Sequence, residues 1–281
     1  MTSTPRTQPR QRGQPDPLRL MGRLSGRDRL ILRTLADHHV LTTDQITDLA
    51  FDSLRAAQQR LVVLDRLGVV GRFRDRLPAG SQPWRYYLAP AGAAIIAAER
   101  GQPAPAPSKV RARAIALAAS QRLPHLLGVN GFFTALAAAA RTSAGTCALE
   151  QWWPERRCAA EYGELVRPDA YGVWRQHRRR VGFFLEHDQA TEPTARAAAK
   201  LAGYADLAIA EDTPVVVLFW LPSPDREASL RPELERAAPR AVTVATATPT
   251  PGPASRPSVA AATRRPARLP GRPTTRTPTR Q

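Results

Sequence analysis

The chain has 281 residues, 27 prolines and a formal net charge of +17 at neutral pH. This length allows two modest domains, and the proline content indicates that part of the chain lies outside them. Two cysteines are too few for a disulfide framework, and no apolar run reaches the roughly 18 residues that a membrane span needs. With no apolar signal-peptide core near its N-terminus, the chain is expected to be a cytoplasmic protein with no membrane partner.

The positive charge is concentrated at the two ends of the chain. Residues 1–23 carry a net charge of +4 and residues 239–281 carry +8, which leaves +5 for residues 24–238. Both ends are rich in Pro and Arg, and we expect 1–23 and 223–281 to be disordered basic arms, with at most one helix near 231–238. Such arms suit a polyanion such as DNA, which they would bind without sequence preference.

Residues 24–101 have the pattern of a winged helix-turn-helix domain. Three short helices joined by brief turns are expected first: 25–39, 42–51 and 53–67. Two strands around a turn-rich loop then form a wing: 69–73 and 84–88. A short helix at 89–101 closes this domain, and the Pro/Ala stretch 102–108 is the expected linker.

The third expected helix and the wing carry side chains that suit DNA. Arg and Gln make bidentate contacts with guanine and adenine edges, and hairpin arginines reach phosphate or the minor groove. The predicted DNA-binding residues are Arg55, Gln58, Gln59, Arg72, Arg74 and Arg85, and Arg60 also falls outside the expected core. The alternative is that any exposed helix in an arginine-rich chain looks like this and that the domain docks a protein. We expect double-stranded DNA as the partner.

Residues 109–222 alternate helices and strands. Helices are expected at 109–121, 130–141 and 191–208, and strands at 146–152, 166–174, 180–188 and 214–221. Val215–Trp220 is apolar without alternation, as is typical of a strand buried on both faces. This order predicts an α/β layer with its own core. His125, just before the second helix, is expected at the surface.

Three carboxylates lie on two of these strands: Asp169, Glu186 and Asp188. Side chains two residues apart on a strand share a face, so Glu186 and Asp188 should point the same way and His187 the other way. Buried carboxylates are costly unless they are paired, hydrogen-bonded or bound to a metal. The simpler alternative is a strand end at which the acids meet water. Glu150, one strand away, is a candidate third acid.

The sequence of this region resembles that of the plasmid replication-relaxation family. The resemblance rests on Arg167-Pro168-Asp169, on Phe183-Phe184-Leu185-Glu186-His187-Asp188, and on Thr191-Glu192 before a helix with Lys200 and Tyr204. It implies a winged helix followed by an α/β, restriction-endonuclease-like domain similar to the PD-(D/E)xK nucleases. It also implies Asp169 and Glu186 as ligands of Mg²⁺.

The implied catalytic residues are Asp169, Glu186, Asp188 and Lys200. Asp188 stands where the nuclease pattern has lysine, so it is open whether this domain is an enzyme. Only two of the 41 basic residues are lysines, Lys109 and Lys200. Lys200 either supplies the missing cation or is a solvated helix residue.

Three functions follow from these observations. The first is a DNA-binding protein of plasmid replication or transfer with metal-dependent endonuclease activity. The second is a non-catalytic regulator that has the same domains and a degenerate nuclease-like site. The third is an adaptor whose winged helix docks a plasmid replication or transfer protein. We expect DNA binding in plasmid maintenance, and the identity of residue 188 separates the first two.

Overall fold

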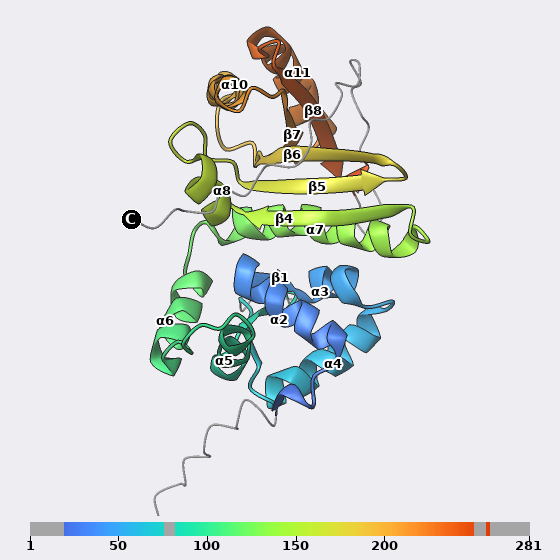
Figure 1. Cartoon of the computed structure of the whole chain (residues 1–281), viewed down its shortest axis with the longest axis vertical. Helices are drawn as coiled ribbons and strands as arrows, with labels where there is room; N and C mark the ends of the chain where they lie inside the picture. Colours follow the sequence, from blue (N-terminus) through green and yellow to red (C-terminus); the bar gives the residue numbers. More distant parts are fainter. Residues whose placement is uncertain (1–19, 76–81, 250–256, 259–281) are drawn as a thin grey trace, which may run out of the picture. The chain divides into compact units, whose positions relative to one another are not determined.

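The computed structural model describes residues 20–75, 82–249 and 257–258 and has a mixed α+β fold with two sheets (Figure 1). The chain divides into two compact units. The first comprises the described residues up to Thr43 and Ala50–Ser120, and the second comprises Asp44–Leu49 and the described residues from Gln121 onward. Helix α3 (Thr43–Ala50) therefore falls almost entirely in the second unit.

The first unit packs helices on a small antiparallel sheet of strand order β1-β3-β2. Its elements are α2 (Gly26–His38), β1 (Val40–Thr42), α4 (Leu54–Arg66), β2 (Val70–Phe73), β3 (Arg85–Leu88), α5 (Pro90–Glu99) and α6 (Pro107–Ala118). Ser25 and Asp28 form a capping box at the start of α2, and Ser53 caps α4. Gly68 follows α4 with φ +70°, a left-handed conformation that favours glycine at the end of a helix.

Two features of this unit differ from the sequence prediction. Strand β1 was not predicted, because three residues are too few to show an alternating pattern. Helix α6 was assigned to the second domain but lies in the first unit, where it contacts α5 and buries Val110 and Ala114. The loop at the tip of the expected wing, 76–81, lies outside the described residues.

The second unit is built on a mixed sheet of strand order β4-β5-β6-β7-β8-β9. The strands are β4 (Cys147–Pro154), β5 (Ala170–Gln176), β6 (Arg179–His187), β7 (Val215–Trp220), β8 (Val242–Pro249) and β9 (Pro257–Ser258). Strands β4, β5 and β6 are antiparallel neighbours, β6, β7 and β8 run parallel, and β9 is antiparallel to β8. Strands β5 and β6 form an antiparallel hairpin, so the start of β5 lies beside the end of β6, where Ala170 pairs with Leu185.

Helices cover both faces of this sheet. They are α7 (Leu123–Thr142), α8 (Glu155–Tyr162), α9 (Thr194–Ala199), α10 (Leu201–Ala210) and α11 (Pro224–Ala237). Phe132 and Phe133 of α7 pack on one face with Phe183 and Leu185 of β6. Residues of α9, α10 and α11 pack on the other face around Phe184. Alternate residues of β6 thus face different helices.

The expected disordered tail from residue 223 is wrong for its first part. Ser223 caps α11, which buries Leu230 and Leu234 against the sheet. Strand β8 then pairs along the full length of β7, so both elements belong to the core. The sequence indicated only the second half of α11, near 231–238, because the segment is rich in Pro, Arg and Thr, and tertiary burial decides its structure. The rest of that tail lies outside the described residues apart from β9.

Two smaller corrections concern helices of the second unit. Residues 155–162 form α8, in a stretch for which no helix was expected. The expected helix 191–208 is divided at Lys200 into α9 and α10. Within the described residues, α7 alone is long and apolar enough to cross a membrane, and its Phe132 and Phe133 are buried against the sheet.

Candidate functional site

The acidic residues of the second unit lie where β5 begins and β6 ends. Asp169 directly precedes β5, Glu186 is the next-to-last residue of β6, and Asp188 directly follows that strand. Glu186 faces the helices α9 and α10, and Asp188 reaches α11 on the same face of the sheet. His187 points to the other face, where its ring lies 5.2 Å from that of His125 on α7. The predicted sharing of a face by Glu186 and Asp188 is therefore observed.

Glu186 is 3% exposed and accepts a hydrogen bond at each carboxylate oxygen. Lys200 Nζ donates to Oε2 over 3.0 Å, and the Tyr204 hydroxyl donates to Oε1 over 2.5 Å. Burial, and then the negative charge of Asp169, raise the pKa of Glu186 to about 7. Lys200 also pairs with Glu192 over 3.1 Å, and although burial opposes it, the charge of Glu186 raises the pKa of Lys200. Lys200 is thus an ion-paired residue of the site.

Asp169 accepts hydrogen bonds from two other donors. His125 Nε2 donates to Oδ1 over 2.9 Å, and the His187 amide donates to Oδ2 over 2.7 Å. Burial favours the neutral acid, but the hydrogen bond and charge of His125 outweigh it and lower the pKa of Asp169. The same hydrogen bond raises the pKa of His125. Burial, and then the charge of His125, lower the pKa of His187.

His125 is a site residue that the sequence did not reveal, since it was expected at the surface. It follows Pro124 in the first turn of α7, more than 40 residues before Asp169. Its distance from Asp169 in the sequence did not indicate a contact, because the contact depends on how α7 packs on the sheet. Tyr204 contacts Glu186 as Lys200 does, whereas Arg196, four residues before Lys200, is 80% exposed and pairs with Glu192.

Asp188 has a separate partner. Arg226 Nε of α11 donates to its Oδ2 over 2.7 Å, and the Ala190 amide donates to Oδ1 over 2.6 Å. Glu150 lies further along the sheet and pairs with Arg175 and Arg180. Of the candidate acids, Asp169 and Glu186 share the charge of Lys200, while Asp188 and Glu150 are neutralised elsewhere.

These contacts test whether the site suits Mg²⁺. Each of the four carboxylate oxygens of Asp169 and Glu186 accepts a hydrogen bond from a protein donor. Mg²⁺ demands octahedral oxygen ligands at about 2.1 Å and would stand beside the Lys200 ammonium. Among the residues the structure describes, no group of three or more His, Cys, Asp or Glu is arranged to hold a metal ion. As arranged, the donor set does not fit Mg²⁺ and forms a network neutralised by its own side chains.

A second candidate surface lies on α4 and the β2–β3 hairpin of the first unit. Ala57, Leu61 and Leu64 of α4 are buried, whereas Arg55, Gln58 and Gln59 are exposed, as their predicted role requires. On the hairpin, Arg72 and Arg74 lie over Trp84 at 4.4 and 4.3 Å from the ring centroid. Arg72 also pairs with Asp65 over 3.1 Å, and Arg85 pairs with Asp75 over 2.8 Å.

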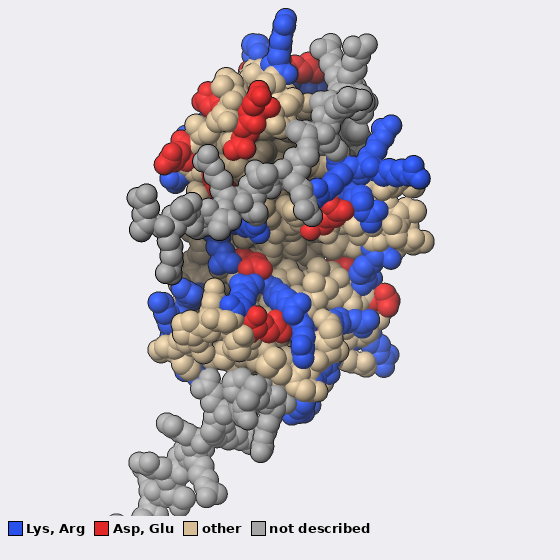
Figure 2. All heavy atoms as spheres, in the orientation of Figure 1, with Lys and Arg blue, Asp and Glu red and all other residues tan. Residues whose placement is uncertain are grey.

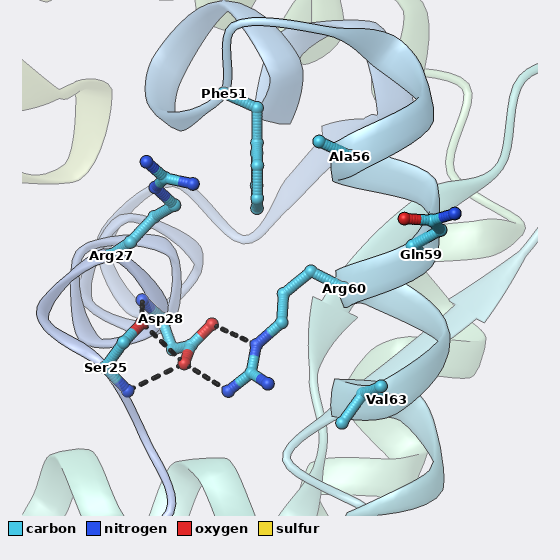
Figure 3. A pocket seen from close by; sticks show the side chains of 8 residues that line it. All are labelled: Ser25, Arg27, Asp28, Phe51, Ala56, Gln59, Arg60 and Val63. Atoms are coloured by element: carbon cyan, nitrogen blue, oxygen red, sulfur yellow. Dashed lines mark hydrogen bonds and ion pairs between the residues drawn. The ribbon is translucent and has the colours of Figure 1, made fainter.

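A hollow of about 570 Å³ flanks this surface between α2 and α4 (Figure 3). It is lined by Ser25, Arg27, Asp28, Phe51, Ala56, Gln59, Arg60 and Val63. Arg60 donates to both carboxylate oxygens of Asp28, whose side chain is fully buried, and these bonds tie α4 to the start of α2. Arg60 is therefore a structural residue.

The sequence matches the model of a known protein family over both candidate surfaces. The family model described as replication-relaxation matches residues 32–215, about two thirds of the chain. This chain belongs to the replication-relaxation family. The match spans α4, the β2–β3 hairpin and the Asp169–Lys200 region, so both candidate surfaces lie within the family's shared sequence. Membership indicates a role in plasmid replication or transfer. Searches of curated proteins and of solved structures gave no match.

Proposed function

We propose that this replication-relaxation protein binds double-stranded DNA through a winged helix, in the cytoplasm, during plasmid replication or transfer. The observation that carries the proposal is the exposed face of α4, which presents Arg55, Gln58 and Gln59 opposite its buried side. These side chains suit base edges in the major groove. In chain order, the elements α2, β1, α3, α4, β2 and β3 follow the order of a winged helix.

The hairpin supports the same proposal. Stacking on Trp84 holds the Arg72 and Arg74 guanidinium groups in defined positions, which lowers the entropy lost when they contact phosphate. A protein-docking role is less well supported, because the exposed positions of α4 are polar, whereas interface cores are enriched in aromatic anchors.

Replacing residues of α4 tests the proposal. Arg55→Ala and Gln59→Ala should each weaken binding to a specific duplex by about 1–3 kcal/mol, because each removes a bidentate base contact. Fluorescence anisotropy at fixed salt, with a duplex selected from a random pool, measures the loss. Arg113→Ala, which removes an exposed arginine of α6, is the matched control and should leave affinity nearly unchanged. Equal affinities for all these variants would contradict a DNA-reading α4.

For the second unit we propose a nuclease-like scaffold without metal chemistry. The support is the saturation of Asp169 and Glu186 by His125, Lys200, Tyr204 and the His187 amide. In this role the site connects α7, β6 and α10, so its charges hold the layers of the unit together.

Titration with Mg²⁺ distinguishes the scaffold from an endonuclease. A metal that binds only the folded state raises the melting temperature by mass action. We expect no rise with millimolar Mg²⁺ or Mn²⁺ beyond that given by matched ionic strength, and no cleavage of duplex DNA. A metal-dependent rise in melting temperature that is lost in Asp169→Asn with Glu186→Gln would favour the endonuclease instead.

A further inference from the structure

The hairpin that joins β5 and β6 ends in a basic tip, which we define as Arg175–Arg180. Within it, Arg178, Arg179 and Arg180 are exposed, and His177 and Arg178 form the turn. Figure 2 shows basic side chains gathered at this end of the sheet. None of these residues was among the predicted DNA contacts.

The tip is held in a fixed shape by its neighbours. Glu150 lies at an irregularity in the pairing of β4 with β5 and is contacted by Arg180 Nε over 2.5 Å and Arg175 Nε over 3.2 Å. A bulge of this kind re-aims a side chain. The His177 amide donates to the Thr146 carbonyl over 2.7 Å, although His177 has φ +52°, a conformation that favours glycine. The backbone at His177 thus has a conformation in which glycine would be less strained.

Two cations of the tip, Arg178 and Arg179, are free to contact an external partner. Glu150 offsets one charge of Arg175 and Arg180, and within the described part of the chain no carboxylate lies within ion-pair distance of Arg178 or Arg179. The acidic site lies at the opposite end of β5 and β6, about 20 Å away at the usual rise per strand residue. That separation exceeds the Debye length at physiological salt, so the acids do not repel an anion at the tip.

We infer that the basic tip is a second contact for the phosphate backbone of duplex DNA. The inference rests on the proposed DNA binding and adds a contact on the second unit. Guanidinium groups bind phosphate bidentately, and Arg178 in the turn is followed directly by Arg179, the first residue of β6. The tip lacks aromatic anchors, so it suits a charged backbone better than the apolar core of a protein interface. Such a contact adds affinity without reading sequence.

The salt dependence of binding by the full chain tests this inference. Each phosphate contact contributes about 0.9 to the slope of log K against log salt. Arg178→Ala with Arg179→Ala should therefore make the slope shallower by about 1–2 and lower affinity for specific and random duplexes by the same factor. Arg178→Lys with Arg179→Lys should keep most of the slope, because the charges remain.

The matched control removes two exposed arginines elsewhere in the same unit. Arg196→Ala with Arg236→Ala lowers the net charge equally, and these side chains are 80% and 70% exposed. This control should change the slope by much less. If the tip variant keeps the wild-type slope while Arg55→Ala weakens binding, the tip contact is overturned and DNA binding stands. If Arg55→Ala and Gln59→Ala also leave binding unchanged, the proposed function itself fails.

Discussion

Two carboxylates at the same end of the sheet carry opposite pKa shifts. Glu186 is more deeply buried, and burial raises its pKa despite the donors Lys200 and Tyr204. Asp169 accepts from His125 and a backbone amide, and these outweigh burial and lower its pKa. Environment at the scale of single hydrogen bonds therefore decides which acid is charged at neutral pH.

The raised pKa of Glu186 predicts how stability depends on pH. Its ordinary pKa is 4.5 and its folded pKa is about 7, so between these values the folded state binds more protons than the unfolded state. The contribution of Glu186 to the free energy of unfolding is complete below pH 4.5 and falls as pH rises to about 7, by on the order of 3 kcal/mol. Glu186→Gln should remove this fall, because glutamine does not titrate.

Urea denaturation of both proteins between pH 4.5 and 8 measures this difference. Tryptophan fluorescence suits the experiment because four of the five tryptophans lie in the second unit. His125, His187 and Asp169 titrate in both proteins, so their contributions largely cancel. Glu211→Gln, which changes an exposed carboxyl group of the same unit, is the control. A wild-type minus Glu186→Gln difference that stays constant with pH would contradict the raised pKa.

At the scale of elements, α11 and β8 show that the second unit extends beyond residue 222. Strand β8 covers one edge of β7, and α11 buries Leu230 and Leu234 beside Val217 and Phe219. Without them, β7 would present unpaired backbone groups and apolar side chains to water, a known aggregation hazard. Arg226 of α11 also neutralises Asp188.

Truncation tests this boundary. A chain ending at residue 222 should lose the cooperative unfolding of the second unit and become sensitive to trypsin under native conditions. A chain ending at residue 258 should keep the full-length melting temperature, since it retains every described element. Thermal unfolding with limited proteolysis compares the two. Equal melting temperatures would show that α11 and β8 add nothing to the core.

At the scale of the whole molecule, the positive charge is distributed unevenly along the chain. Residues 24–238 carry only +5 of the total of +17. Within the second unit, the acidic site and the basic tip occupy opposite ends of the same two strands. In the first unit, several arginines already pair with acids, as Arg60 does with Asp28. The location of cations, and not their number, decides which surfaces suit DNA.

The sequence by itself determined the local features of this protein. Helical periodicity located α2 and α4, and the structure shows that Ser25 and Ser53 cap them. Strand alternation correctly placed Glu186 and His187 on opposite faces of β6. These features depend on neighbours a few residues apart, so they can be read from the chain directly.

Only the tertiary structure decided which distant residues meet. His125 reaches Asp169, Arg226 reaches Asp188, and Arg60 turns inward to Asp28. The segment of α11 and β8 has weak local preferences and is ordered by burial against β7. The same packing brings Lys200 and Tyr204 to Glu186. The acids at this end of the sheet are therefore paired with donors and cations from the helices.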